Sequence, residues 1–325
     1  TGGCYITLII PGRGRKVMKP DDQAAVPLLP TLAMMAVVLV WGLSFVSSKS
    51  VFNAGFPPMT TALVRFSLAS LILFPLHRKL HPEITVGRTH RLPLALSGLF
   101  GVSLYFVFEN WGIKLSSASS AALIIGAIPV FVALAEHLFF HNRVTWYQGA
   151  GIAVSLGGVY LLVQGSGGRS PNMLAGNLLM LGACLSWVVY NILSRNLQKS
   201  FPGISLVAYQ SLAGTLYLVP LALLESGSWL AGGGPAVWLN LLYLSLLCSA
   251  AAYFLYLYAL RQLGAVVVST YINLIPLAGA LGGVIILGER LTGLQVAGGA
   301  VVLAGVAMVS MDAWIRRRSS GRAPR

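Results

Sequence analysis

Long apolar stretches separated by short polar loops run through almost the whole chain. In windows of about 19 residues, ten stretches are long and apolar enough to cross roughly 30 Å of hydrocarbon as helices. The predicted crossings are Leu28–Val51, Met59–Leu76, Pro93–Gly112, Ser117–Phe140, Trp146–Val163, Met173–Leu193, Ile204–Leu224, Val237–Leu260, Ala265–Leu287 and Leu294–Trp314. An even number of crossings places both ends of the chain on one side of a membrane.

Composition supports a lipid environment for the whole chain. Hydrophobic residues make up 56% of the sequence and charged residues only 9%, against about 25% charged residues in globular proteins. A water-soluble fold is therefore excluded. The net charge of +14 does not indicate nucleic acid as a partner, because the basic residues lie in short clusters between apolar runs, as in the cytoplasmic loops of membrane proteins.

The distribution of Lys and Arg predicts the orientation. Of the 22 basic residues, 17 lie in the terminal segments and in the loops on the same side, while Arg65 lies within a crossing. The other side holds four, namely Lys49, Lys114, Arg169 and Arg290. Because cytoplasmic loops retain positive charge, we expect both termini to be cytoplasmic and the protein to lie in the plasma membrane.

The two terminal segments are expected to lie outside the helical fold. Residues 1–27 are predicted to form a disordered cytoplasmic tail, and residues 316–325 a basic cytoplasmic one. Within Thr1–Val17 the charges follow the apolar patch, which is the reverse of the order in a signal peptide.

The two halves of the chain resemble each other at a fixed spacing. A shift of 147 residues places Ile128 and Pro129 on Ile275 and Pro276, and it continues without a gap over about 45 residues. The same shift pairs Lys114 with Arg261, Arg143 with Arg290, Gln148 with Gln295, Gly151 with Gly298 and Gly158 with Gly305, and a shift of 146 pairs Trp41 with Trp187, Ser48 with Ser194 and Lys49 with Arg195. Five crossings per half set the copies antiparallel, so the sequence predicts inverted repeats at 28–165 and 173–315.

Two local motifs carry a resemblance to a known family. The first half opens with Trp41-Gly42-Leu43-Ser44-Phe45, and the second closes with the run from Leu287-Gly288-Glu289 to Gln295, followed by Gly298 and Gly305. Together with the repeat, this pattern resembles the EamA-like family of the drug/metabolite transporter superfamily. In the first half, His141 and Asn142 stand where Gly288 and Glu289 would map. The resemblance implies a ten-helix secondary transporter, commonly an exporter of amino acids, metabolites or drugs, and it does not identify the solute.

Three ionisable residues inside the crossings are candidates for function, because a charge at the bilayer centre costs roughly 2.5–3.5 kcal/mol on insertion scales. Arg65 and Glu109 have overlapping depths toward the outer side, so they could form an ion pair or a shared polar site, or extend separately to the outer interface. Glu136 lies near the inner end of its crossing, where it could bind a coupling proton or pair with Arg78 or Arg143. Glu225 and Glu289 are expected to be structural loop residues.

Aromatic and amide side chains form a second set of candidates. Trp187, Tyr190 and Asn191 share one helical face. The full predicted substrate-binding set is Trp41, Arg65, Glu109, Trp187, Tyr190, Asn191, Gln210, Tyr253, Tyr271 and Asn273. Buried amides in a bilayer need partners, so we expect this set to face a cavity for a small amphipathic solute, although each aromatic alone could serve only packing or an interface belt.

Prolines and glycines suggest how such a protein moves and packs. Pro129 and Pro276 each remove a backbone donor at the same repeat position, which predicts two hinges for alternating access or two static kinks. Gly151 with Gly158, and Gly298 with Gly305, form stripes for close helix packing that would also suit a homodimer.

Other kinds of function have weaker support. The three cysteines and five histidines do not show metal-ligand spacing, and Gly-x-x-x-x-Gly-Lys-Ser/Thr does not occur, so neither a metal nor another cofactor is expected. An intramembrane enzyme would need clustered catalytic groups, whereas these charges are dispersed. A channel or a scaffold remains the alternative to a secondary exporter of a small amphipathic metabolite.

The charge distribution gives a direct test of orientation. Cysteines replacing Arg88 and Arg322 should resist a membrane-impermeant thiol reagent added to intact cells, because both positions are predicted to be cytoplasmic. Rapid labelling of both from outside would reverse the orientation.

Overall fold

The chain is all-helical over the part that the structure describes. The computed structural model describes residues 28–141, 144–167, 171–225 and 234–319, and no strand occurs among them. Ten helical segments within these residues are long and apolar enough to span a membrane. The predicted fold class, an all-α membrane protein with ten crossings, is confirmed. The predicted N-terminal tail lies outside the described residues, and the C-terminal one largely so, because its first residues continue the last helix to Ser319.

Several crossings consist of more than one helical element. The elements are α1 (Leu28–Asn53), α2 (Pro58–Leu80), α3 (Arg88–Gly98), η1 (Leu99–Leu104), α4 (Tyr105–Leu115), α5 (Ala118–Ile125), α6 (Ile128–Phe140), α7 (Trp146–Gly167), α8 (Pro171–Leu197), α9 (Gly203–Leu223), α11 (Pro235–Leu242), η2 (Tyr243–Ala251), α12 (Ala252–Ile272), α13 (Ile275–Leu287) and α14 (Gly293–Ser319). The third crossing runs through α3, η1 and α4, and the eighth through α11, η2 and most of α12.

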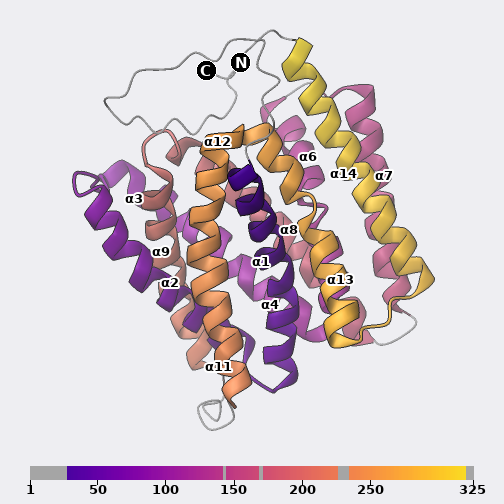
Figure 1. Cartoon of the computed structure of the whole chain (residues 1–325), viewed down its shortest axis with the longest axis horizontal. Coiled ribbons are helices and arrows are strands. Elements are labelled where there is room, and N and C mark those ends of the chain that lie inside the picture. The colour runs from indigo at the N-terminus through magenta and orange to yellow at the C-terminus, as the bar shows by residue number, and fades with distance from the viewer. Residues whose placement is uncertain (1–27, 142–143, 168–170, 226–233, 320–325) are drawn as a thin grey trace.

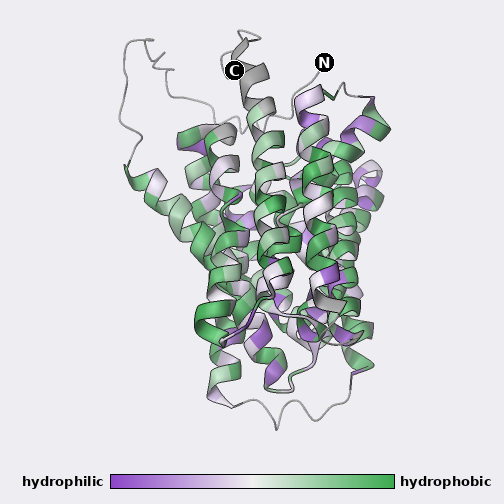
Figure 2. Cartoon of the chain, turned by 90° about the vertical axis from the view of Figure 1, so that its right-hand side faces the viewer, coloured by the Kyte–Doolittle hydropathy of each residue, from purple (hydrophilic) through white to green (hydrophobic). Residues whose placement is uncertain are grey.

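The helices form one bundle whose surface suits lipid. Helix α1 begins and α14 ends on the same side of the molecule, and α7 and α14 lie side by side at one edge (Figure 1). Apolar residues dominate the middle of the helices, and hydrophilic ones collect mainly toward the ends (Figure 2). Exposed side chains include Leu71, Leu216 and Ile285, at 70%, 65% and 76%. Such a surface is stable only against hydrocarbon. We call the side that carries Lys49, Glu225 and Glu289 the outer face, following the predicted orientation.

The inverted repeat is visible as matched interruptions of the helices. The fourth crossing breaks between α5 and α6, and the ninth breaks between α12 and α13, with a proline in the first turn of each restarted helix. The restarted helices also end alike, since His141 and Gly288 both adopt the left-handed conformation, with φ of 53° and 65°. The two breaks meet inside the bundle, because a Cβ on Gly126 would lie 2.6 Å from Pro276 Cγ.

A second matched interruption is a π-helical stretch in the third and eighth crossings. The repeat shift of 147 residues places η1 within η2. A π-turn leaves backbone carbonyls without their usual helical donors, and such turns occur frequently at functional sites. In each stretch a side chain from the other half supplies a donor: Trp41 Nε1 to the Cys248 oxygen at 2.9 Å, and Ser186 Oγ to the Phe100 oxygen at 2.7 Å. The two halves therefore complete each other's interrupted helices.

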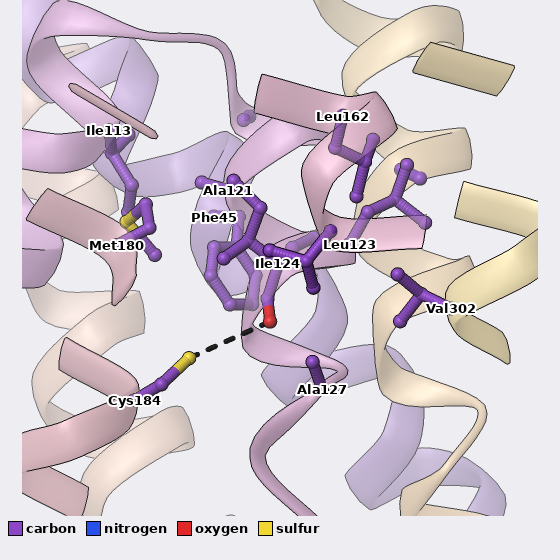
Figure 3. Packing of buried hydrophobic residues seen from close by; sticks show 14 of the residues in the cluster. Phe45, Ile113, Ala121, Leu123, Ile124, Ala127, Leu162, Met180, Cys184 and Val302 are labelled. Carbon is purple, nitrogen blue, oxygen red and sulfur yellow. Dashed lines mark hydrogen bonds between the residues drawn. The ribbon is translucent and has the colours of Figure 1, made fainter. Parts of the chain in front are cut away.

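Helix α5 lies in the middle of the largest apolar core. Its residues from Ala118 to Ile124 are all buried. Figure 3 shows Ile124 with its carbonyl toward the Cys184 thiol, which donates to it at 3.6 Å, and Ile113 of α4 close to Met180 of α8. Leu162 of α7 and Val302 of α14 are fully buried and complete the core.

The glycine stripes bring α7 and α14 together within one chain. A Cβ on Gly151 would lie 3.0 Å from the Gly305 oxygen, and one on Gly158 would lie 2.8 Å from the Gly298 oxygen. These contacts are related by the repeat, since each glycine of one helix faces the counterpart of the other glycine. The stripes are thus occupied by intramolecular packing, and a homodimer remains a prediction that would need another surface.

Gly158 tests this packing directly. In Gly158→Ala the new methyl group would lie 2.6 Å from the Val302 backbone nitrogen, so α7 and α14 must move apart. We expect the free energy of unfolding to fall by about 1–3 kcal/mol, measured as a lower Tm of the purified protein. Gly157→Ala is the control, because nothing lies within 4 Å of its Cβ. Equal melting temperatures for the two variants would contradict the packing.

Candidate functional site

Arg65 is a buried cation with hydrogen-bond donors that have no protein acceptor among the described residues. It lies on α2, is 9% exposed, and its Nε donates to Ser249 Oγ of η2 at 2.8 Å. The guanidinium carbon lies 4.7 Å from the ring centroid of Phe106 and 5.4 Å from that of Phe66. A guanidinium has five N–H donors, and among the described residues only the Nε donor has an acceptor. Four donors are therefore available to a bound anion or to water.

Glu109 is a buried anion on the neighbouring helix α4. It is 7% exposed and accepts a hydrogen bond from the Tyr105 hydroxyl at 2.8 Å. Within the described part of the chain, no Arg65–Glu109 ion pair within 4.0 Å occurs, so the expected direct pairing is not formed. The Arg65 charge still acts on the Glu109 carboxyl electrostatically. The alternative, a shared polar site, stays a prediction.

A row of aromatic rings starts at these two charges. We call Phe66, Phe106, Tyr105, Trp187 and Tyr190 the aromatic row, because successive ring centroids lie 4.6, 4.9, 5.1 and 4.9 Å apart. The row joins α2, α4 and α8 and thus links the two halves of the chain. At its far end the Tyr190 hydroxyl donates to Gln210 Oε1 at 3.2 Å.

Gln210 occupies a repeat position close to that of Arg65. Unlike Arg65, it has hydrogen-bond partners for its amide oxygen and for both amide hydrogens. Its Nε2 donates to Ser97 Oγ at 3.1 Å and to Ser194 Oγ at 3.0 Å. The amide therefore joins α9 to α3 and α8, and it is 2% exposed. This bonding satisfies a polar group that would be costly to bury alone.

Trp41 and the tyrosines of α12 form a smaller aromatic group. Trp41 lies 5.7 Å from Tyr256, and Tyr256 lies 6.3 Å from Tyr253, measured between ring centroids. Tyr253 donates to the Gly203 oxygen at 3.2 Å. Helix α9, which begins at Gly203, also carries Gln210, the acceptor at the far end of the aromatic row.

The remaining residues of the predicted substrate-binding set are Asn191, Tyr271 and Asn273. Asn191 donates to the Trp187 oxygen of its own helix at 2.8 Å, and Asn273 donates to Ser310 Oγ of α14 at 3.1 Å. Tyr271 packs beside the cluster that α1 and α12 form around Met34. Among the described residues, neither Tyr271 nor Asn273 has a hydrogen bond or a ring contact with the aromatic row.

The two prolines and Glu136 have clear positions, while their functions remain predictions. Pro129 and Pro276 stand where helices restart, and therefore require no backbone donor there. Glu136 is exposed near the inner end of α6, which leaves it accessible to a proton from that side.

Several contacts could not be predicted from the sequence. His77 follows the predicted crossing Met59–Leu76, but it is fully buried in the last part of α2, where its Nδ1 and Nε2 lie 2.9 Å from Ser205 Oγ and 3.1 Å from Tyr209 Oη. Ser249, which accepts a hydrogen bond from Arg65, is 184 residues away in the sequence, so only the tertiary fold brings the two together. Tyr105 could have been found from the sequence, because it lies four residues before Glu109 on the same helix.

The architecture indicates a class of protein. Among the described residues, no three His, Cys, Asp or Glu side chains are grouped to hold a metal ion. Inverted repeats, broken helices that cross inside the bundle, and buried opposite charges are the architecture of secondary transporters.

Comparison with known proteins identifies the family. The model of the EamA-like transporter family matches residues 28–164 and again residues 174–311. The chain belongs to this family, as its sequence motifs predicted, and it is a multi-pass membrane transporter.

Relatives cover nearly the whole chain. A Streptantibioticus cattleyicolor protein named "Probable terminal-alkyne amino-acid exporter" is 29% identical over 89% of this chain and 95% of its own. A Salmonella typhimurium protein named "Probable amino-acid metabolite efflux pump" is 28% identical over 84% of this chain and 91% of its own. One crystal structure, 20% identical, aligns with a TM-score of 0.61 over 90% of this chain and 99% of that chain, and it supports the fold alone.

Proposed function

We propose that the protein is a secondary active exporter of a small amphipathic metabolite, either an amino acid or a drug-like solute resembling one, across the plasma membrane by alternating access. The observation that carries this proposal is the buried pair of opposite charges, Arg65 and Glu109, which do not neutralise each other by direct contact. The names of the amino-acid exporters among the relatives support the same solute class.

The arrangement of charges suits a zwitterion. The free guanidinium donors of Arg65 match a carboxylate, because two parallel N–H···O bonds can form between them. Glu109 has one oxygen bonded to Tyr105 and another without a partner among the described residues, which is an acceptor for an ammonium group. A solute that carries both charges would replace the direct ion pair that the two side chains lack.

The aromatic row suits the apolar part of the same solute. Phe106 and Tyr105 precede Glu109 on α4, and Trp187 continues the row on α8. Stacking against these rings would bind a hydrophobic side chain while Arg65 and Glu109 fix the polar end. We infer that solutes with an α-amino acid head and an apolar or aromatic tail are recognised best.

The charge pair gives a test that depends on solute chemistry. In Arg65→Leu, transport efficiency for such an amino acid should fall at least about tenfold, because charge-assisted bonds to the carboxylate are lost. Transport of the matching amine, which lacks the carboxylate, should fall much less. Glu109→Gln should show the opposite preference and retain the matching carboxylic acid. Uptake into everted membrane vesicles measures all three solutes.

Matched controls separate recognition from folding. Arg88→Leu removes an exposed charge at the start of α3 on the inner side and should leave uptake unchanged. The double variant Arg65→Leu with Glu109→Gln avoids an uncompensated buried charge, and its Tm shows whether the bundle remains folded. Equal losses for the amino acid, the amine and the acid would contradict charge-specific recognition.

A further inference from the structure

Two charged side chains hold the loop between α4 and α5 at the outer face. Glu289, in the segment after α13, accepts the backbone N–H groups of Ala118 at 2.7 Å and Ser119 at 2.9 Å. A carboxylate stabilises a helix N-terminus, because the unpaired N–H groups there carry partial positive charge. One charge from the second half therefore holds the first turn of α5 in the first half.

Lys49 holds the other side of the same loop. From α1, its Nζ donates to the carbonyl oxygens of Ile113 at 2.9 Å, Lys114 at 3.0 Å and Ser116. Three acceptors match the three protons of the ammonium group. The C-terminus of α4 thus receives a cation, as the N-terminus of α5 receives an anion. We call Lys49 and Glu289 the outer clamp.

The outer clamp closes an interface that is tightly packed. Helix α5 packs directly against α13, and Ser119 Oγ donates to the Ala280 oxygen at 2.9 Å. Gly283 allows this approach, because a Cβ there would lie 2.2 Å from Ser119 Oγ and 2.5 Å from Glu289 Oε2. The fourth and ninth crossings are therefore joined from their breaks to the outer face.

The repeat-related interface at the inner face is not formed in the same way. Its members would be α6 and the last two turns of α12, yet among the described helices α6 packs against α7, α8 and α14 instead. The counterparts of the outer residues also differ in character, since Glu136 replaces Gly283 and Asn142 replaces Glu289. Arg195, the counterpart of Lys49, lies 4.9 Å from the Phe140 ring centroid. Over the described helices, the same pair of crossings is thus packed together on the outer side, while α6 has other main neighbours on the inner side.

We infer that Lys49 and Glu289 are positioning residues of an outer gate, which keep the transporter closed to the outside until the loop between α4 and α5 is released. This inference rests on the proposed alternating-access function and adds the residues that govern one of its states. Opening to the outside would separate α5 from α13, and the loop would have to leave Glu289 or Lys49. Closing the inner side would bring α6 toward α12, as the repeat requires.

Another acidic residue at the same face provides a matched comparison. Glu225 accepts the N–H groups of Met59 at 2.9 Å and Thr60 at 2.7 Å, at the start of α2. Like Glu289, Glu225 is a carboxylate that accepts two backbone N–H groups at the start of a helix. The α2–α9 pair, however, is also joined at its inner end, by a hydrogen bond between His77 and Ser205. Because both ends of this pair are joined, Glu225 should stabilise the fold without favouring one state.

Two repeat-related cysteines can report the state without any solute. Ala280→Cys lies in the outer interface, where Ala280 is 7% exposed, and Ala133→Cys occupies its counterpart on α6. Each is combined with Cys4→Ser. The native Cys184 and Cys248 are buried, and their labelling in Cys4→Ser alone gives the background rate. An impermeant thiol reagent is applied to intact cells for Ala280→Cys and to everted vesicles for Ala133→Cys.

Glu289→Gln should shift the two reporters in opposite directions. Loss of the charge and of one acceptor should raise the labelling rate of Ala280→Cys about tenfold and lower that of Ala133→Cys. Lys49→Met should do the same, whereas Glu225→Gln should lower the Tm and leave both rates unchanged. Unchanged labelling rates in Glu289→Gln would show that Glu289 is a static helix cap and would overturn the inference. Faster labelling of both cysteines would show a general loosening of the bundle and would overturn it as well. Because no solute is added, failure here is distinguishable from failure of the proposed transport activity, which is measured by flux.

Discussion

The bilayer does not supply hydrogen bonds to the backbone, so every interruption of a helix needs a partner from within the chain. This constraint explains where the scarce polar side chains lie. Trp41 and Ser186 donate to carbonyls of the two π-helical stretches, and Lys49 and Glu289 hold the ends of α4 and α5. In each of these contacts except the one between Lys49 and α4, the donor and acceptor come from different halves. Satisfying the backbone therefore also holds the inverted repeats together.

Arg65 and Glu109 differ from these polar side chains, because their hydrogen-bonding groups are only partly used. Each has one hydrogen-bond partner, yet both keep unused capacity while they are more than nine-tenths buried. Gln210, at nearly the same repeat position as Arg65, has its amide bonded to three hydroxyls. The repeat thus supports a structural amide in one half and a charged site in the other. A membrane protein that keeps such costly charges without pairing them directly has a use for them in recognising a solute.

The sequence was sufficient for the features that depend on local pattern. Hydropathy predicted the ten crossings, and the shift of 147 residues predicted that Pro129 and Pro276 occupy matched places. It was insufficient where tertiary contacts decide. The π-helical stretch Leu99–Leu104 has no distinguishing residue, His77 is buried only because Ser205 and Tyr209 lie opposite, and Glu289 acts on a helix 170 residues away. Asn273 was expected beside the aromatic residues, but the break before α13 places its amide against Ser310.

Flux through purified protein is the most direct test of a transporter with this site. The protein would be reconstituted into liposomes loaded with an unlabelled aromatic amino acid, and entry of the same labelled amino acid from outside would be followed over time. Alternating access predicts saturable entry that is accelerated by the internal solute, because exchange returns a loaded carrier in each direction. Entry that rises linearly with concentration and ignores the internal solute would indicate a channel and contradict the account.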